Sequence, residues 1–204
     1  MQKLLLILTI CFAAAAFSCN SGKTEVKDNK KKTENNFNPY FPVVEGNKWV
    51  YINDGERDET EPFTVSLKDI KKTEDGLQLK VSTFPYLTKD NTERTIRVKS
   101  NGEIEINDYM GSSGVFIPAA NDFKKDYKWS FGIFNAFITS VNEKAVTEDG
   151  TYENCVYVMM TDGFTFSFEM WFKKDIGIVK WGANRTNPPT LKPDYYVLKS
   201  HNLN

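Results

Sequence analysis

Residues 95–106 read TIRVKSNGEIEI. Apolar residues alternate with polar ones on both sides of an Asn-Gly pair: Ile96 and Val98 come before it, and Ile104 and Ile106 come after it. Alternation places the apolar side chains on one face of a strand, and Asn-Gly accepts the positive φ angles of a tight type I′ turn. The stretch therefore predicts an antiparallel β-hairpin with one buried face and one solvent face.

The same period of two recurs along the chain, in residues 63–68, 77–82 and 164–169. Further hairpin turns are predicted by Asp-Gly pairs at 54–55, 75–76, 149–150 and 162–163. Parallel strands would need crossover segments of a dozen or more residues, and most gaps here are shorter. We therefore predict an all-β, mainly antiparallel fold: a single curved sheet that forms a half-barrel or barrel with up-and-down or meander connections.

One long segment lacks the alternation. Residues 108–130 include Gly111, Gly114 and Pro118, and we predict that they form a loop or flap. Within this segment, residues 121–128 are the one candidate for a helix, so we expect at most one short helix in the chain.

The first 18 residues have the layout of a secretory signal peptide: Lys3, then a nearly unbroken apolar run over residues 4–17, then small residues before a cleavage site. The run is too short to span a bilayer as a helix, which needs about 20 residues.

Cys19 follows directly, and residues 16–19 resemble the lipobox of bacterial lipoproteins, although Ala16 replaces the usual Leu and Phe17 is bulky for its position. The resemblance implies that Cys19 is acylated and becomes the mature N-terminus. The rival prediction is an unlipidated secreted protein with a Cys19–Cys155 disulfide.

Residues 20–36 form a lysine-rich stretch with a single aliphatic residue, Val26, and no aromatic one. Such a stretch buries too little apolar surface to offset the entropy of ordering it, so we expect residues 19–36 to be the lipidated cysteine and a flexible polar tether. Residues 37–204 are then a single β domain. They carry 20 Lys and Arg against 24 Asp and Glu, a net charge of −4 that gives no electrostatic reason to bind nucleic acid.

Five segments carry a resemblance to a known family. In chain order they are residues 40–51 (YFPVVEGNKWVY), Ile117-Pro118, Trp129, residues 150–158 (GTYENCVYV) and residues 171–181 (WFKKDIGIVKW). Together they resemble a Bacteroidetes-type family of envelope lipoproteins whose activity is unassigned. Ile176 and Val43 depart harmlessly from the family pattern, and the resemblance supplies no catalytic residue. It implies export and a lipid anchor in the bacterial envelope, in the outer membrane, with the domain on the periplasmic or the surface face.

The sequence contains few of the residues that usually act in catalysis. His201 is its one histidine, so a Cys155–His201 pair is the sole candidate for histidine-assisted nucleophilic chemistry. We expect His201 to be exposed and Cys155 to be a buried, inert thiol that is dispensable for activity. Glu103 and Glu105 alternate with isoleucines and so belong to a solvent face, and the acidic residues at 54–61 miss the spacing of a calcium loop. No metal or other cofactor is expected.

The aromatic content, 15 Phe, 9 Tyr and 4 Trp, is the unusual feature of the composition. We expect the tryptophans at 49, 129, 171 and 181 to anchor the core, and the phenylalanines at 131, 134, 137, 164, 166, 168 and 172 either to fill it or to line an apolar cavity.

The first functional hypothesis is a non-enzymatic envelope lipoprotein, with a binding or structural role, whose sheet is its working surface. Its partner is the membrane, through the N-terminal lipid; ligand-binding residues and any protein partner are unknown. The alternatives are a carrier of a hydrophobic small molecule or lipid, and a carboxylate-dependent hydrolase.

Overall fold

The computed structural model of this protein describes residues 37–54, 61–83, 93–109, 111–185 and 194–204. The predicted signal peptide (1–18), Cys19 with its tether (19–36) and most of the acidic segment at 54–61 lie outside the described residues. The predictions made for them therefore stay predictions.

Twelve strands form one sheet in which each hydrogen-bonded neighbour is antiparallel, so the predicted all-β antiparallel fold is confirmed. The order is a meander with one rearrangement, because the last strand pairs with the first: β6-β5-β4-β3-β2-β1-β12-β11-β10-β9-β8-β7. The strands are β1 (Lys48–Asn53), β2 (Phe63–Thr73), β3 (Gly76–Ser82), β4 (Glu93–Lys99), β5 (Ile104–Tyr109), β6 (Ser112–Ile117), β7 (Lys128–Phe131), β8 (Phe134–Thr147), β9 (Gly150–Thr161), β10 (Phe166–Lys173), β11 (Gly177–Arg185) and β12 (Asp194–Asn202).

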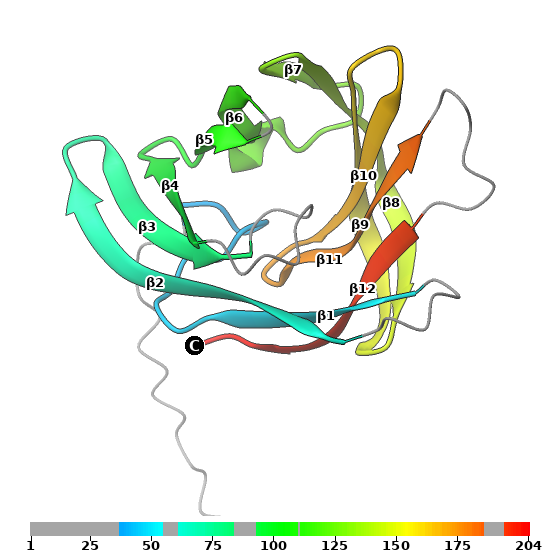
Figure 1. The fold of residues 1–204 in the computed structure, drawn as a ribbon, viewed down its shortest axis with the longest axis horizontal. Helices are drawn as coiled ribbons and strands as arrows, with labels where there is room; N and C mark the ends of the chain where they lie inside the picture. Colours follow the sequence, from blue (N-terminus) through cyan, green and yellow to red (C-terminus); the bar gives the residue numbers. More distant parts are fainter. Residues whose placement is uncertain (1–36, 55–60, 84–92, 110, 186–193) are drawn as a thin grey trace, which may run out of the picture. The chain divides into compact units, whose positions relative to one another are not determined.

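The sheet curls into a nearly closed barrel whose two edge strands, β6 and β7, approach each other (Figure 1). Side chains bridge this seam: the rings of Phe116 on β6 and Phe131 on β7 meet edge to face with centroids 5.3 Å apart. A Cβ atom on Gly132 would stand 2.2 Å from the Oγ atom of Ser112, so the chain beyond β7 passes very close to the start of β6. Curvature thus covers both edges without a continuous hydrogen-bonded ladder.

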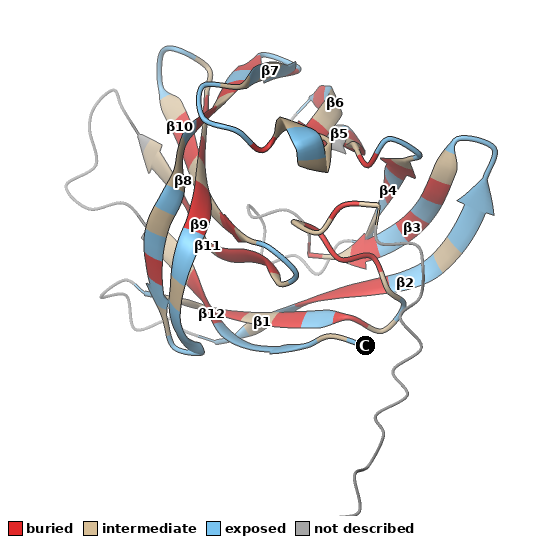
Figure 2. Ribbon diagram, turned by 180° about the vertical axis from the view of Figure 1, so that it is seen from behind, coloured by how far each residue is buried: buried red, intermediate tan, exposed pale blue. Residues whose placement is uncertain are grey.

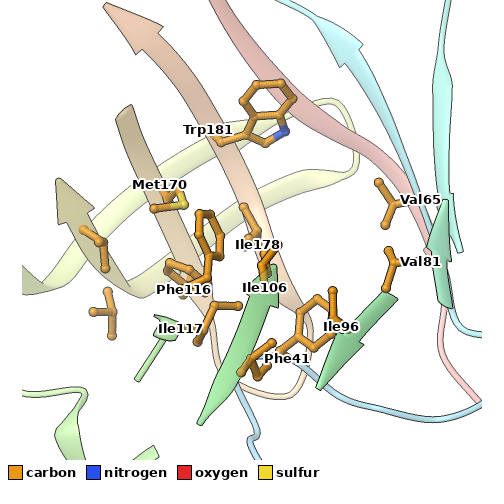
Figure 3. Packing of buried hydrophobic residues seen from close by; sticks show 14 of the residues in the cluster. Phe41, Val65, Val81, Ile96, Ile106, Phe116, Ile117, Met170, Ile178 and Trp181 are labelled. Carbon is orange, nitrogen blue, oxygen red and sulfur yellow. The ribbon is translucent and has the colours of Figure 1, made fainter. Parts of the chain in front are cut away.

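The predicted alternation is realised on the inner face. Ile96, Val98, Ile104 and Ile106 are at most 1% exposed, and the register pairs Ile96 with Ile106 and Val98 with Ile104. Figure 2 shows the resulting bands of buried and exposed residues along β3 and β4. In Figure 3, side chains from β2, β3, β4, β5, β6, β10 and β11 converge with Phe41 in the interior. Burial of these stripes is the main force that holds the sheet in its curved form.

Three details differ from prediction. The Asn101-Gly102 turn is not type I′, since only Gly102 of the pair has a positive φ (+88°), and the N–H of Gly102 donates to the carbonyl of Lys99. This is a type I turn followed by a left-handed glycine, a longer hairpin loop. Residues 108–130 are not a loop or flap, because they contain the end of β5, all of β6 and most of β7. The helix expected at 121–128 is reduced to one 3₁₀ turn, Ala120–Asp122.

Before β1, residues 37–47 form a strap that ties together turns from distant parts of the sheet. The Nδ2 atom of Asn38, a fully buried residue, donates to the carbonyls of Gly102 (2.9 Å) and Pro118 (2.8 Å). The N–H of Asp175, in the β10–β11 turn, donates to the carbonyl of Pro39 (2.7 Å). Asn38 and Pro39, which come directly before the YFPVVEGNKW segment of the family resemblance, therefore give the strap a structural role.

Candidate functional site

The outer face of the sheet differs between its two halves. On β2–β5 the outward side chains are mostly charged and pair with one another across strands. The ammonium of Lys99 lies 2.7 Å from a Glu105 oxygen and 3.2 Å from a Glu103 oxygen. Lys80 likewise pairs with Asp69 (3.4 Å). This surface, called here the charged face, is what an antiparallel sheet with one wet side is expected to show.

On β9–β12 the outer face carries aromatic residues instead. Register places them side by side: Tyr157 on β9 is opposite Trp171 on β10, and Trp171 is opposite Lys180 on β11. In the neighbouring row, Glu169 is opposite Gly182, which is opposite Tyr195 on β12. The side chains of this set are half-buried, and we call it the aromatic face: Tyr157, Glu169, Trp171, Lys180 and Tyr195.

The rings and the ammonium group of the aromatic face are in direct contact. Tyr157 stacks on Trp171 with ring centroids 4.7 Å apart, and Tyr195 meets Trp171 edge to face at 5.7 Å. The Nζ atom of Lys180 lies 4.3 Å from the centroid of Tyr195 and 5.3 Å from that of Trp171. A cation held between two aromatic rings is attracted to both, so Lys180 helps to fix their positions.

Glu169 orients Tyr195. The Tyr195 hydroxyl donates to a Glu169 carboxylate oxygen at 2.7 Å, and the same carboxylate lies near the Tyr157 hydroxyl. Burial, and secondly the neighbouring Glu169, raises the pKa of both phenols above the ordinary value of 10.0, so both remain protonated donors at neutral pH. A carboxylate can accept about four hydrogen bonds, so Glu169 keeps acceptor capacity after binding the Tyr195 hydroxyl.

The apolar character extends past these five residues. Phe137 on β8 pairs with Met159 on β9, which pairs with Glu169, and both Phe137 and Met159 are half-buried. At the other end of the Trp171 row, Val197 on β12 is opposite Lys180 and is only 3% exposed. A band of apolar and aromatic side chains therefore crosses five strands of the outer face.

The sequence analysis missed this site because it assigned every tryptophan to the core. Trp49 and Trp181 are in the core, at 2% and 3% exposure, and Trp129 is half-buried against it. Trp171 is also half-buried and packs against the core cluster, but its ring contacts with Tyr157, Tyr195 and Lys180 form on the outer face, which the sequence analysis did not predict. The signal was present in β10, where Trp171 shares its parity with Glu169 and Lys173, whereas the buried Met170 and Phe172 have the other parity.

Cys155 and His201, the candidate catalytic pair, each hydrogen-bond to a different residue. Cys155 is fully buried as expected, and its thiol donates to the carbonyl of Tyr152 (3.4 Å), while burial raises the pKa of the thiol. The ring of His201 instead contacts a carboxylate oxygen of Asp149, Nδ1 to Oδ2, at 2.8 Å, and the Tyr152 hydroxyl donates to that same oxygen. A protonated, shielded thiol is a poor nucleophile.

The carboxylate hypothesis gains no support from the described residues. Glu103 and Glu105 share the Lys99 ammonium on the charged face, and the buried polar residues of the described chain are asparagines, serines and a threonine. The same ranges contain no group of three or more His, Cys, Asp or Glu residues placed to hold a metal ion. Nor, within them, does any helix have the length and apolar character needed to cross a bilayer.

The positions of the phenylalanines test the alternative hypothesis that the protein carries a hydrophobic ligand in an apolar cavity. Phe131, Phe134, Phe168 and Phe172 are buried in the core cluster, whereas Phe164 lies in the β9–β10 turn and is 80% exposed. Buried rings contact each other in the interior: Phe134 meets Phe168 with centroids 5.5 Å apart, and Phe123 meets Phe172 at 5.4 Å. Mutual ring contacts favour the interpretation in which these side chains fill the barrel.

Two solved structures are similar to this chain. One, from Bacteroides fragilis, is described as an exported protein with a YmcC-like fold; it has a TM-score of 0.53 and 12% identity, over 80% of this chain and 99% of that one. The other, described as a lipoprotein from Parabacteroides distasonis, has a TM-score of 0.50 and 14% identity, over 81% and 99%. At such identities the likeness shows a shared fold, the YmcC-like fold. No family model and no curated protein matches the sequence.

Proposed function

We propose that this chain is an exported lipoprotein, anchored in the bacterial outer membrane through acylated Cys19, that acts by binding a macromolecule rather than by catalysis. The aromatic face is its working surface. One observation carries the proposal: Trp171 and two tyrosines, half-buried and held in place by Lys180 and Glu169, stand on the side of the sheet that normally faces water.

The chemistry of the aromatic face suits a protein-sized partner. Tyrosine, tryptophan, phenylalanine and methionine are enriched in the buried centres of protein interfaces, and rigid aromatic residues supply most of the binding energy there. The rings are already positioned by stacking and by the hydrogen bond from Tyr195 to Glu169, so association would cost little ordering entropy. Small-molecule sites are concave, whereas this face lies on the outside of a curved sheet (Figure 1).

The proposed anchor rests on the chain's N-terminal sequence. Residues 1–18 have the signal-peptide layout, Cys19 follows the cleavage site, and residues 20–36 are polar. The descriptions of the two similar structures, as an exported protein and as a lipoprotein, are consistent with this proposal. Two or more acyl chains on one residue make a firm anchor, because each buried methylene adds about 0.8 kcal/mol.

The anchor is tested by fractionating cells that express Cys19→Ser. The variant is expected to leave the membrane fraction and to incorporate no labelled fatty acid. Cys155→Ser is the matched control, and it is expected to remain with the membranes, because the buried Cys155 thiol takes no part in anchoring. A Cys19→Ser chain that still sediments with membranes, together with an unlabelled wild-type chain, contradicts the proposal.

The working surface is tested by photo-crosslinking in living cells. A benzophenone amino acid placed at Met159, on the aromatic face, is expected to give a discrete crosslinked species that Trp171→Ala abolishes. The same group placed at Gln78, an exposed residue on β3 of the charged face, is the control and is expected to give no such species. Equal crosslinking from both positions, or none from Met159, contradicts a binding role for this face.

A further inference from the structure

Among the described residues, the two charged groups of the aromatic face form no ion pair with each other or with another charged side chain. Within the described part of the chain, the Lys180 ammonium contacts aromatic rings and forms no ion pair with a carboxylate. Glu169 accepts a hydrogen bond from the Tyr195 hydroxyl and has no cationic partner in the same part of the chain. The charged face behaves differently, since its lysines Lys68, Lys80 and Lys99 each lie within ion-pair distance of a carboxylate.

We propose that the aromatic face binds a second copy of this chain, with Lys180 of each copy pairing with Glu169 of the other. The inference rests on the proposed function of this face and names its partner. A twofold symmetric interface uses the same patch on both copies, so the patch must be complementary to itself. A patch with one cation and one carboxylate, each without an oppositely charged partner among the described residues, meets that requirement.

The register of β10 and β11 shows how the contact is made. Glu169 is opposite Gly182, and Trp171 is opposite Lys180, so these four residues form a quadrilateral with Glu169 and Lys180 at the ends of one diagonal. A twofold axis lying along the other diagonal, from Trp171 to Gly182, exchanges the positions of Glu169 and Lys180. When two copies stack face to face about this axis, each ammonium lies over a carboxylate and the two Trp171 side chains meet near the axis.

The neighbouring residues fit this arrangement. Tyr157 and Tyr195 flank the quadrilateral and supply amphipathic rings, while Phe137 and Met159 extend the apolar band along β8 and β9. Aromatic residues at the centre exclude water from the two crossed ion pairs, which strengthens their attraction. An unrelated partner would need to reproduce the same pair of opposite charges at the same spacing, whereas a second copy provides it by symmetry.

The test uses the full-length chain in cells, expressed from two plasmids with two different epitope tags. With the benzophenone amino acid at Met159, the expected product is a crosslinked species of twice the chain mass that carries both tags. Lys180→Glu alone, or Glu169→Lys alone, places like charges opposite each other and is expected to lower the yield about tenfold or more. The double variant Lys180→Glu with Glu169→Lys is expected to restore the yield, because the exchanged charges again meet opposite signs.

Lys180→Arg keeps the positive charge and is expected to retain crosslinking. Circular dichroism and the amount of chain in the membrane fraction show that each variant is folded before the yields are compared. A Met159 crosslink to a different protein overturns self-association and leaves the proposed binding function standing. The absence of any crosslink overturns both, and a double variant that stays as low as the single ones overturns the crossed charge pairs.

Discussion

The charged face and the aromatic face lie on the same side of one sheet, yet different physical interactions organise them. On the charged face, Lys99 and its carboxylates form ion pairs whose side chains keep 21–28% of their exposure. On the aromatic face, Trp171 stacks on Tyr157 and lies near the Lys180 ammonium, and the Tyr195 hydroxyl donates to the Glu169 carboxylate. Ion pairs hold the first arrangement, whereas ring stacking, cation–π contacts and a hydrogen bond hold the second.

The difference matters because water weakens the two sets of contacts to different degrees. Exposed ion pairs contribute about 0–1 kcal/mol each and are screened by salt. Aromatic contacts remove apolar area from water and add about 0.5–1.5 kcal/mol per ring pair, with little dependence on salt. An outer face built in this second way is costly to leave in contact with solvent, which is why we assign it the binding role. The two faces can therefore be compared quantitatively by mutation.

The largest effect is expected for Trp171→Ala. Loss of a half-buried indole and of its contacts with Tyr157 and Tyr195 should lower the free energy of unfolding by about 2 kcal/mol, somewhat below the cost of truncating a fully buried tryptophan. Urea denaturation followed by circular dichroism measures it. Arg97→Ala on the charged face is the matched change and should cost less than about 0.5 kcal/mol. Equal losses at the two positions would remove the energetic distinction between the faces.

A smaller effect is expected for Tyr195→Phe, which deletes the hydroxyl bonded to Glu169. The loss should be about 1 kcal/mol, the usual net value of one hydrogen bond. Tyr196→Phe is the control: Tyr196 stacks on Trp181, its hydroxyl has no hydrogen-bond partner among the described residues, and the change should be nearly neutral. A loss for Tyr196→Phe as large as that for Tyr195→Phe would show that ring packing, and not the bond to Glu169, is responsible.

The same pair of variants gives a pH test. The folded protein holds the Tyr195 proton more tightly than the unfolded chain does, because burial and Glu169 raise the pKa of this phenol above 10.0. The contribution of the Tyr195 phenol to the free energy of unfolding is therefore complete below a pH of about 10 and declines as the pH rises above that value. Denaturation curves across this range should fall less steeply for Tyr195→Phe than for the wild-type chain. Identical slopes would count against the raised pKa.

The smallest effect is expected for Lys99→Met on the charged face. Removing the partner of Glu103 and Glu105 should cost about 0.5 kcal/mol at low ionic strength. At about 1 M salt, where charges are screened beyond about 3 Å, the cost should become undetectable. The cost of Trp171→Ala should be the same at both salt concentrations. A Lys99→Met cost that does not change with salt would mean that this face, too, depends on packing.

Much of the fold could be predicted from the sequence, because the alternation of apolar and polar residues that marks a strand is visible within a few consecutive residues. The period of two in residues 95–106 identified Ile96, Val98, Ile104 and Ile106 as a buried stripe, and all four are buried. The turn type was wrong at Asn101-Gly102, since dipeptide composition locates a turn without setting the φ of each residue in it. The strand β6 was missed because Gly111, Gly114 and Pro118 obscure the alternation around it, and β7 was missed because its four residues are too few to show a clear period.

The candidate site was much less predictable. Trp171, Lys180 and Tyr195 lie on three different strands, and their meeting depends on register, which comes from long-range pairing. Cys155 was correctly expected to be buried, but the contact between His201 and Asp149, 52 residues apart, has no local signal in the sequence. Phe164 was grouped with the strand that follows, although the turn at 162–165 leaves it exposed.

By itself, the sequence determined the strand character of the chain, the positions of most hairpins and the apolar stripes that become the inner face, because these follow from side-chain parity within a few residues. Only the tertiary structure decided how far the sheet curls, that β12 returns to pair with β1, and that an aromatic cluster faces outward on β9–β12. Strand order and register are set by the packing of the whole core and by the strap at residues 37–47. A side chain's partners across strands therefore emerge only when the entire sheet has formed.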